Sequence, residues 1–371
     1  MHSVLQVMMS AGDSTAVVGR TISDAVLEFR FHNLYVHGDK RLSKDEGRCK
    51  TTVLGFGKKS ISGIFRYISM LIIFAKLYKQ KPSLIVAHRY KCVDVSSFLS
   101  KIYKVPLVIV VHGVGEFDRS YRARKLNTLV RRGATVVCVS KYVESYIKSC
   151  LHEKVKNSLA GEQIITIENS IDFSLKRSEQ VSKQSARDNL AVDNINKLLV
   201  GYVGRLANVK GVVDVVDAST QFEHGGVHFV IVGDGPLASE LTKNADCTSI
   251  ANNLSFLGFV PDAYRYFKAF DLIVLPSRSE GFPLTLLEAV AARVPFITTD
   301  IEVYREVVGN DKVFYTPGDV DQLCERISFM LALQQAGKLD SFGKEQGLQI
   351  ESKYPFSGFI NSYTRLLERL V

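Results

Sequence analysis

"DLIVLPSRSEGFPLTLLEAV", residues 271–290, contains an apolar run, a short turn and a helical pattern in direct succession. The run 271–277 is rich in large aliphatic residues without polar alternation, as in a strand buried on both faces. From Leu284 onward, apolar residues recur at three- and four-residue spacing, which predicts a helix. Glu280 lies in the turn and Glu288 two helical turns later. This order is typical of a parallel sheet covered by helices.

Similar units recur along the chain and predict an α/β protein with two doubly wound domains. The chain has 371 residues, of which 46% are hydrophobic, and a mean hydropathy of +0.06. This length exceeds one ordinary core, so two domains are expected. A polar stretch poor in large apolar residues separates the two sets of strands. The predicted parts are a first domain over 1–172, a linker over 173–196, a second domain over 197–352 and a C-terminal helix over 353–371.

The cysteines and the N-terminus favour a cytoplasmic protein. The six cysteines are scattered, with no CxxC pair and no cluster with histidine, which argues against a zinc site or a disulfide framework. The N-terminus lacks the basic start and long apolar stretch of a signal peptide. The longest apolar run, 68–75, is too short to span a bilayer.

The basic character of the chain belongs to its first half. The formal net charge is +9, with +13 over residues 1–172 and −4 over the remainder. This asymmetry suggests that the first half meets nucleic acid, anionic lipid or a phosphorylated glycan. A focus lies in 118–133, where no acidic residue follows Asp118. We hypothesise that its cations dock the first domain on anionic lipid or on an acidic lipid-linked acceptor: Arg119, Arg122, Arg124 and Lys125.

Two further features bear on the partner of the basic half. The stretch 57–81 is apolar over much of its length and basic at both ends. We expect it to be a buried core helix with a basic rim; a membrane-inserting helix is the alternative. Nucleic-acid binding would place aromatic residues among the cations, but Tyr121 alone lies within 119–132 and the chain has no tryptophan. We therefore expect no nucleic-acid partner.

Cations follow the first strand of the second domain. In "VGYVGRLANVKG", 200–211, Arg205 follows Gly204 at the strand end, and Lys210 precedes the next helix. Arginine offers a bidentate fork for phosphate, and a lysine beside a helix N-terminus adds a point charge. An ordinary strand–helix loop with surface charges is the alternative. The glycines of "VIVGDGPL", 230–237, are typical of a tight turn.

The two glutamates of the opening stretch suggest a ligand with hydroxyl groups. Free N–H groups at the start of the helix form an anion site that suits a diphosphate. Glu280 beside that anion is unsuited to phosphate but suits sugar hydroxyls, and Glu288, on about the same helix face, suits a second pair such as a ribose. The alternative is that Glu280 caps the helix and Glu288 is solvated.

The motifs together resemble a known family. "VGRLxxxKG", "VGDGPL", "LGFV" (257–260) and "LPSxxEGFPLTLLEA" follow one another with about one βα unit between them. In that order they resemble the retaining family-4 glycosyltransferases of the GT-B fold, over nearly all of the second domain. The resemblance implies two Rossmann-like domains that face a central cleft, with a C-terminal helix whose return to the first domain is left open.

The resemblance also implies roles for individual residues. Arg205 and Lys210 would neutralise the donor diphosphate, Glu280 would bind the donor sugar and Glu288 the ribose. His112, at the end of "VIVVHG" (108–113), would lie near the transferred sugar; a capped loop histidine is the alternative. The implied donor site also includes Gly204, Val260, Gly281, Phe282, Pro283 and Leu284. On the acceptor side, the first loop of the family usually carries paired glycines. In this sequence the loop is "SAGDST", 10–15, and Gly12 is its one glycine.

The reaction implied is sugar transfer from a UDP- or GDP-sugar to an acceptor hydroxyl on a surface glycan or lipid-linked glycan, with retained anomeric configuration. No metal is expected, because the cations and the helix N-terminus would stabilise the leaving diphosphate. The one Asp-x-Asp, 319–321, is predicted to be a helix N-terminus. A cytoplasmic enzyme peripheral to a membrane is expected. The alternative is a nucleotide-binding protein that uses its basic face without catalysis.

Overall fold

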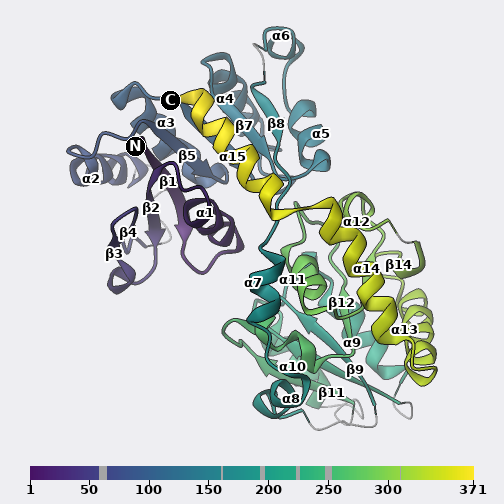
Figure 1. Ribbon diagram of the computed structural model, residues 1–371. Coiled ribbons are helices and arrows are strands. Elements are labelled where there is room, and N and C mark those ends of the chain that lie inside the picture. Colours follow the sequence, from purple (N-terminus) through teal and green to yellow (C-terminus); the bar gives the residue numbers. More distant parts are fainter. Residues whose placement is uncertain (58–64, 160–161, 193–196, 223–225, 247–252, 310) are drawn as a thin grey trace. The chain divides into compact units, whose positions relative to one another are not determined.

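The computed structural model describes residues 1–371 except 58–64, 160–161, 193–196, 223–225, 247–252 and 310. The chain forms two compact units (Figure 1). The first contains Met1–Asn169 together with Ser357–Val371, and the second contains Ser170–Phe356. Each unit is built on its own sheet, as the alternation of apolar runs and helical patterns predicts.

The first unit contains an eight-stranded sheet of order β3-β4-β2-β1-β5-β6-β7-β8. The strands are parallel except β3, which runs antiparallel to β4. The central strands are buried throughout, which explains their unbroken aliphatic sequences. The strands are β1 (Ser3–Ser10), β2 (Arg30–His37), β3 (Lys44–Glu46), β4 (Cys49–Val53), β5 (Leu84–His88), β6 (Leu107–Val111), β7 (Thr135–Cys138) and β8 (Ile164–Thr166).

Helices connect these parallel strands. A clear N-cap is Ser140, whose hydroxyl accepts a hydrogen bond from the Val143 N–H at the start of α5. The helical segments of this unit are α1 (Ser14–Ala25), η1 (Lys40–Leu42), α2 (Phe65–Leu77), α3 (Tyr90–Tyr103), α4 (Ser120–Arg131), α5 (Lys141–Ser149), α6 (Glu153–Lys156) and α15 (Phe356–Leu370).

The second unit contains a parallel six-stranded sheet of order β11-β10-β9-β12-β13-β14. Its strands are β9 (Leu198–Val203), β10 (Val227–Val232), β11 (Leu254–Gly258), β12 (Leu272–Leu275), β13 (Phe296–Thr299) and β14 (Phe314–Tyr315). Its helical segments are α7 (Phe173–Ser178), α8 (Lys183–Leu190), η2 (Asn208–Lys210), α9 (Val212–Thr220), α10 (Ala238–Asp246), η4 (Ala263–Ala269), α11 (Leu284–Ala292), α12 (Glu302–Val307), η5 (Asp311–Val313), α13 (Val320–Gln335) and α14 (Leu339–Lys353).

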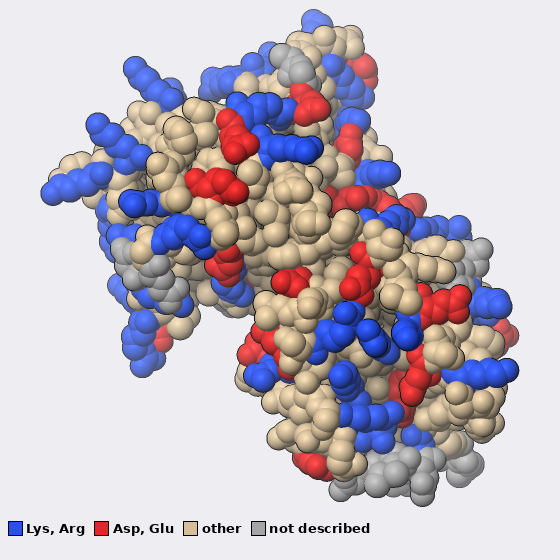
Figure 2. Space-filling model, viewed as in Figure 1, with Lys and Arg blue, Asp and Glu red and all other residues tan. Residues whose placement is uncertain are grey.

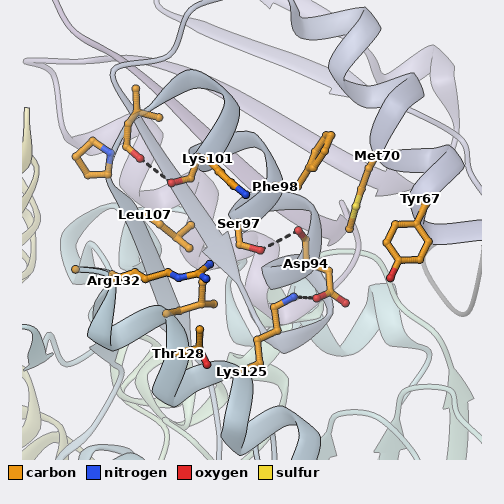
Figure 3. A pocket seen from close by; sticks show the side chains of 16 residues that line it. Tyr67, Met70, Asp94, Ser97, Phe98, Lys101, Leu107, Lys125, Thr128 and Arg132 are labelled. Carbon is orange, nitrogen blue, oxygen red and sulfur yellow. Dashed lines mark hydrogen bonds and ion pairs between the residues drawn. The ribbon is translucent and has the colours of Figure 1, made fainter. Parts of the chain in front are cut away.

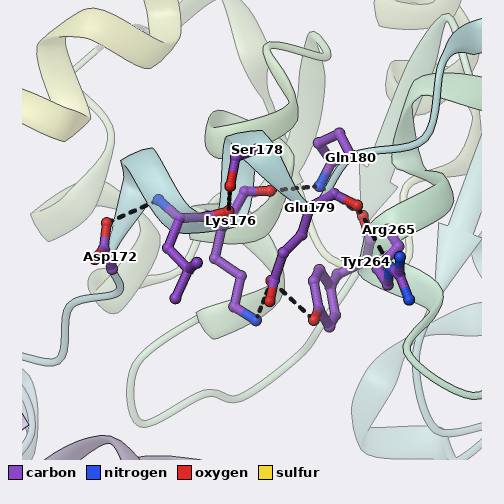
Figure 4. Close-up of polar contacts among 8 residues, drawn as sticks. Asp172, Lys176, Ser178, Glu179, Gln180, Tyr264 and Arg265 are labelled. Atoms are coloured by element: carbon purple, nitrogen blue, oxygen red, sulfur yellow. Dashed lines mark hydrogen bonds and ion pairs between the residues drawn. The ribbon is translucent and has the colours of Figure 1, made fainter.

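The predicted linker differs from the structure. Of 173–196, the last four residues lie outside the described residues, and the rest carries α7 and α8, which belong to the second unit. Figure 4 shows α7 held by polar contacts: Glu179 accepts hydrogen bonds from Lys176 and from the Tyr264 hydroxyl, each at 3.0 Å. The Lys176 ammonium also lies 3.7 Å from the centre of the Tyr264 ring. A polar stretch can therefore form helices that pack against a domain, and need not be a linker, when its charged side chains have partners there.

The stretch 57–81 is not a buried core helix. Residues 58–64 lie outside the described residues, and α2 covers Phe65–Leu77. One side of α2, with Met70, Ile73 and Leu77, is buried, but an apolar stripe on the other side is exposed: Tyr67 56%, Ile68 53%, Leu71 61% and Ile72 41%. A helix that is apolar all round needs partners on all sides, and the side chains described for this one are buried on one side only. Among the described residues, no helix combines the length and apolarity needed to cross a bilayer.

The C-terminal helix α15 belongs to the first unit, although the preceding α14 belongs to the second. Its apolar residues are buried, among them Phe359, Tyr363 and Leu367. Near its end, Arg369 donates to the Glu162 carboxylate at 2.5 Å. The amphipathic pattern at the end of the sequence is therefore explained by packing against the first unit.

Candidate active site

The loops after β9 and β12 bring the second unit's sequence-predicted residues together. These two strands pair in parallel, so their carboxyl ends lie at the same edge of the sheet. Gly204 and Arg205 directly follow β9, with Arg205 exposed. The loop that contains Glu280 follows β12 and leads into α11.

The centre of this edge is an ion pair between Lys210 and Glu280. The Lys210 ammonium lies 2.5 Å from Oε1 of Glu280, and the same oxygen accepts a hydrogen bond of 2.7 Å from the Ser277 hydroxyl. The Glu280 side chain is 16% exposed and that of Lys210 is 32% exposed. Both side chains are partly exposed, so the second carboxylate oxygen of Glu280 and the Lys210 ammonium can still hydrogen-bond to a ligand.

Glycines allow the backbones of this edge to approach closely. Gly211 has φ of +65°, and a Cβ there would lie 1.9 Å from the carbonyl oxygen of Pro276. Gly233, in the predicted turn after β10, has φ of +145°, and its Cβ would lie 1.8 Å from the carbonyl oxygen of Gly204. The two glycines therefore let neighbouring loops touch, which a side chain would prevent.

Helix α11 begins beside the ion pair and has no side-chain cap. Pro283 occupies the N-cap position, and Leu284 is the first helical residue. Glu280 therefore does not cap the helix, since its carboxylate is engaged by Lys210 and Ser277. Gly281, Phe282 and Pro283 are buried, and the Phe282 ring packs edge-on against Tyr354 at 5.3 Å between centroids. This packing fixes the turn that positions the helix N-terminus.

Glu288 is half-buried on α11, and its surroundings differ from those of Glu280. Burial raises the pKa of Glu288 to about 7, and the Lys176 ammonium of α7 acts in the opposite direction. The alternative, in which Glu288 is simply solvated, is therefore wrong. A half-buried carboxyl group with a raised pKa is typical of a ligand site. Lys176 was missed by sequence reasoning, because its stretch was interpreted as a linker.

The end of β11 carries Val260 of the implied donor site, with Phe259 directly before it. Phe259 directly follows the strand and is 74% exposed, and Val260 is half-buried. An exposed aromatic ring at the carboxyl edge of a sheet is a suitable stacking surface for a planar base. Within the described residues, no interaction joins either of these residues to Arg205 or Glu280.

A buried aspartate organises the loops next to the site. Asp214 of α9 accepts hydrogen bonds from the Arg278 guanidinium at 2.8 Å, the Tyr315 hydroxyl at 3.2 Å and the Gly318 N–H at 3.0 Å. Arg278 also donates to the carbonyl of Asn208, in the segment that ends with Lys210. Sequence reasoning missed this network. The available signal was Asp214 itself, a lone acid in the apolar run "VVDVV".

In the first unit, His112 follows β6 and is half-buried. Its Nε2 lies 3.0 Å from Nδ1 of His88, the last residue of β5. Its backbone N–H donates to Oε1 of Glu116 at 3.2 Å. Burial, the His88 ring and the Arg89 charge hold the pKa of His112 well below its ordinary value. His112 is therefore a neutral, hydrogen-bonded ring.

The predicted acceptor-side residues fall into two groups. Gly12 is exposed after β1, and a Cβ there would meet nothing within 4 Å, so Gly12 itself is not needed for close packing. Arg119 and Arg124 are exposed. Lys125, in contrast, forms an ion pair with Asp94, and the Arg122 guanidinium stacks 4.6 Å from the Tyr90 ring centre. Lys125 and Arg122 are therefore held by internal partners, and docking through the four cations stays a prediction.

The Asp-x-Asp over 319–321 is a helix N-terminus, as predicted. The Asp319 side chain accepts a hydrogen bond from the Gln322 N–H at 3.0 Å at the start of α13. In the described part of the chain, no three His, Cys, Asp or Glu residues gather in a way that could hold a metal ion.

Comparison with known proteins identifies the family. The model for "Glycosyl transferases group 1" matches residues 185–346, and the model for "Glycosyltransferase Family 4" matches residues 29–174. This chain belongs to the group 1, family-4 glycosyltransferases. Its fold is GT-B, the two-domain Rossmann-like architecture described above.

Solved structures and relatives agree with this assignment. HepE from Anabaena, crystallised with UDP, superposes with a TM-score of 0.80 over 100% of both chains at 19% identity. Sucrose-phosphate synthase from Thermosynechococcus elongatus gives 0.81 at 17% identity, over 100% of this chain and 99% of that chain. The alpha-monoglucosyldiacylglycerol synthase of Acholeplasma laidlawii is 26% identical over 71% of this chain and 70% of its own length.

Other glycosyltransferases match over shorter parts of their own length. The putative EpsF of Bacillus subtilis is 28% identical over 39% of this chain and 38% of its own length. The putative teichuronic acid enzyme TuaC of the same organism is also 28% identical, over 68% of this chain and 63% of its own length. The chain thus spans less than two thirds of these two relatives.

Proposed function

We propose that the protein is a metal-independent, retaining glycosyltransferase that moves a hexose-type sugar from a nucleotide diphosphate sugar, UDP- or GDP-linked, to a hydroxyl of a glycan or lipid-linked glycan. The observation that carries this proposal is the Lys210–Glu280 pair of 2.5 Å, beside exposed Arg205 and the uncapped start of α11. Cations and a helix N-terminus suit a diphosphate, and a carboxylate at the same edge suits sugar hydroxyls.

In the proposed reaction, negative charge grows on the diphosphate as the glycosidic bond breaks. Arg205, Lys210 and the backbone N–H groups of Gly281 and Phe282 stabilise this charge. Glu280 accepts hydrogen bonds from the sugar, and Glu288 accepts them from the ribose. His112 contacts a hydroxyl of the transferred sugar. The leaving diphosphate takes the acceptor's proton on the same face of the sugar, which retains the anomeric configuration and requires no carboxylate base.

The names of related proteins support the donor and acceptor classes. One Escherichia coli relative, 27% identical over 68% of this chain and 67% of its own length, is a UDP-Gal:alpha-D-GlcNAc-diphosphoundecaprenol alpha-1,3-galactosyltransferase. A Campylobacter jejuni relative, 22% identical over 86% of this chain, transfers N-acetylgalactosamine to a diphospho-undecaprenol-linked sugar. Both use acceptors on a lipid carrier, which is the basis for proposing one here.

The donor class can be tested by thermal unfolding with UDP, GDP or ADP and no added metal. A ligand at one hundred times its Kd adds about 2.7 kcal/mol to stability, which raises the midpoint by roughly 5–10 °C for a unit of this size. We expect one nucleotide to do so for the wild type and a much smaller shift for Arg205→Ala, because the diphosphate loses its bidentate partner. If no nucleotide shifts the midpoint, with or without magnesium, a donor site at this edge is excluded.

We further propose that the protein works at the cytoplasmic face of a membrane and docks through the α2 surface. This surface consists of the exposed apolar side chains of α2 and the exposed lysines that follow them: Tyr67, Ile68, Leu71, Ile72, Lys76, Lys79 and Lys81. Figure 2 shows Lys and Arg side chains projecting from the part of the first unit that contains α2. An apolar stripe bordered by cations is complementary to an anionic bilayer.

A groove of about 730 Å³ adjoins the α2 surface. Tyr67 and Met70 of α2 and Phe98 of α3 line the groove (Figure 3). Two exposed cations, Lys101 and Arg132, lie at its border, and the Lys125–Asp94 ion pair lies inside it. The groove therefore extends the apolar stripe and adds positive charge at the same place, as contact with anionic lipid requires.

Leu71→Glu should weaken membrane binding. Leu71 is 61% exposed, so the substitution leaves the fold intact while it places an anion in the apolar stripe. We expect roughly tenfold weaker sedimentation with vesicles that contain phosphatidylglycerol, and weaker binding of the wild type at high salt. The matched control is Leu348→Glu on α14 of the second unit, where Leu348 is 55% exposed. Equal vesicle binding by both variants, or a change of oligomeric state in Leu71→Glu instead, would contradict the assignment.

A further inference from the structure

The core of the first unit contains three polar side chains, Gln6, His88 and His112, joined in a row by hydrogen bonds. Gln6 of β1 lies 2.8 Å from Nε2 of His88, through its side-chain oxygen. The other ring nitrogen of His88, Nδ1, lies 3.0 Å from Nε2 of His112. Gln6 and His88 are 0% and 1% exposed, whereas His112 is half-buried. Polar groups at such depth need definite partners.

The orientation of the Gln6 amide is fixed by a backbone carbonyl. The Gln6 nitrogen lies 2.8 Å from the carbonyl oxygen of Gly19 and 2.9 Å from Oδ1 of Asn33. A carbonyl oxygen only accepts hydrogen bonds, so the amide nitrogen of Gln6 must face it. Asn33 is oriented in turn. The Ser23 hydroxyl donates to the carbonyl oxygen of Arg20 at 2.9 Å, so its oxygen accepts from the Asn33 nitrogen at 3.0 Å. The Gln6 oxygen therefore faces His88 as an acceptor, and Nε2 of His88 must carry a proton.

His88 has only one ring proton to give. Burial lowers the pKa of His88 to about 3, so the ring is neutral in the physiological range. Because the single ring proton of His88 is on Nε2, its Nδ1 is unprotonated and can only accept a hydrogen bond. The bond of 3.0 Å between the two rings then requires the proton on Nε2 of His112. Each tautomer follows from the one before it, starting at the carbonyl of Gly19.

We propose that Gln6 and His88 are positioning residues that hold His112 in its Nε2–H tautomer, so that Nδ1 presents a lone pair that accepts a hydrogen bond from a substrate hydroxyl. This inference rests on the proposed role of His112 at the transferred sugar. It defines the polarity of that contact: the sugar hydroxyl donates and His112 accepts. His112 then has no proton to give the leaving group.

The surroundings of His112 are consistent with this assignment. Glu116 accepts hydrogen bonds from the backbone N–H groups of His112 at 3.2 Å and Tyr90 at 2.7 Å, and so does not compete for the ring. The Arg89 charge disfavours protonation of the ring. Among the residues that the structure describes, none makes a hydrogen bond to Nδ1 of His112. Gly19 lets α1 approach, because a Cβ there would lie 2.4 Å from Sδ of Met8 and 3.5 Å from Nε2 of His88.

The inference is tested by nitrogen NMR of the full chain with ¹⁵N-labelled imidazole rings. We expect a one-bond N–H coupling at Nε2 of His112 and a scalar coupling across the hydrogen bond to Nδ1 of His88. We also expect both rings to remain neutral between pH 6 and 8. A proton found on Nδ1 of His88, with Nε2 of His112 as the acceptor, would overturn the proposal. This measurement needs no substrate, so its result is independent of the proposed function.

A kinetic comparison separates positioning from general stability. His88→Phe keeps an aromatic ring in the core but removes the acceptor for His112. We expect kcat to fall roughly tenfold or more, with the donor KM within about twofold, because the lost contact orients the reacting sugar. The matched control is His228→Phe in β10, a buried histidine bonded to Ser255, which should leave kcat unchanged. Equal kcat values for wild type and His88→Phe would overturn the positioning role. If nothing tested is transferred by the wild type but the NMR result holds, the proposed function fails and the tautomer assignment stands.

Discussion

Lys210→Ala is expected to lower kcat by roughly 10²–10³, the usual cost of removing one group that stabilises charge growing in a transition state. The Lys210 ammonium is held 2.5 Å from Glu280 and follows β9 beside Arg205. Its removal takes a positive charge from the proposed diphosphate site and leaves Glu280 hydrogen-bonded to the Ser277 hydroxyl. Because the lost interaction is strongest in the transition state, kcat should fall more than the donor KM rises. Release of the nucleoside diphosphate is the measurement.

The control for this experiment is Lys344→Ala. Lys344 is an exposed lysine on α14, and its loss changes the net charge by the same amount. Wild-type turnover is expected for this variant. A Lys210→Ala enzyme with kcat within about twofold of the wild type would remove Lys210 from the proposed phosphate site, provided that its unfolding midpoint is unchanged.

Asp271→Ala is expected to destabilise the second unit by roughly 3–5 kcal/mol, the cost of leaving a buried charge without its partner. The Asp271 carboxylate, 5% exposed, accepts hydrogen bonds from Arg187 at 2.9 Å, from Lys183 at 2.5 Å and from the backbone N–H of Leu199 at 2.9 Å. The Arg187 side chain is only 9% exposed, so its guanidinium would remain buried, hydrogen-bonded to the Ala269 carbonyl but without a carboxylate. For a unit of this size the unfolding midpoint should fall by roughly 6–20 °C.

The same carboxylate supplies its own control, Lys183→Ala. Lys183 lies closer to Asp271 than Arg187 does, at 2.5 Å against 2.9 Å, but its side chain is 51% exposed. Solvent screens this pair, so its loss should cost less than about 1 kcal/mol. Similar midpoints for the Asp271 and Lys183 variants would mean that burial of Arg187 does not determine the stability of this junction.

Most of the fold could be predicted from the sequence because strands of a covered parallel sheet have an unmistakable composition. Buried strands such as Leu107–Val111 and Leu272–Leu275 have aliphatic residues at every position. The segments that were misinterpreted have the opposite character. α7 and α8 are polar helices stabilised by long-range pairs, and α2 is an apolar helix with an exposed apolar stripe on one side. Composition predicts burial only when an element's surroundings are also known.

The donor-side residues could be named from motifs, but their contacts could not. Lys210 and Glu280 are 70 positions apart and meet only because β9 and β12 are neighbours in the sheet. The pKa of Glu288 depends on burial and on Lys176 of another helix. A side chain's neighbours across the sheet are set by strand order, which the spacing of residues along the chain does not contain.

By itself, the sequence determined the α/β class, the two-unit organisation and the chemistry available at the strand ends, because alternating buried strands, glycine turns and polar strand-end residues are local patterns. Only the tertiary structure decided which way His112 carries its proton, which cations are held by internal partners and which face of α2 is left uncovered. These properties depend on groups brought together from distant parts of the chain. A single backbone carbonyl, that of Gly19, can orient a histidine 93 positions away only once β1, β5 and β6 lie side by side.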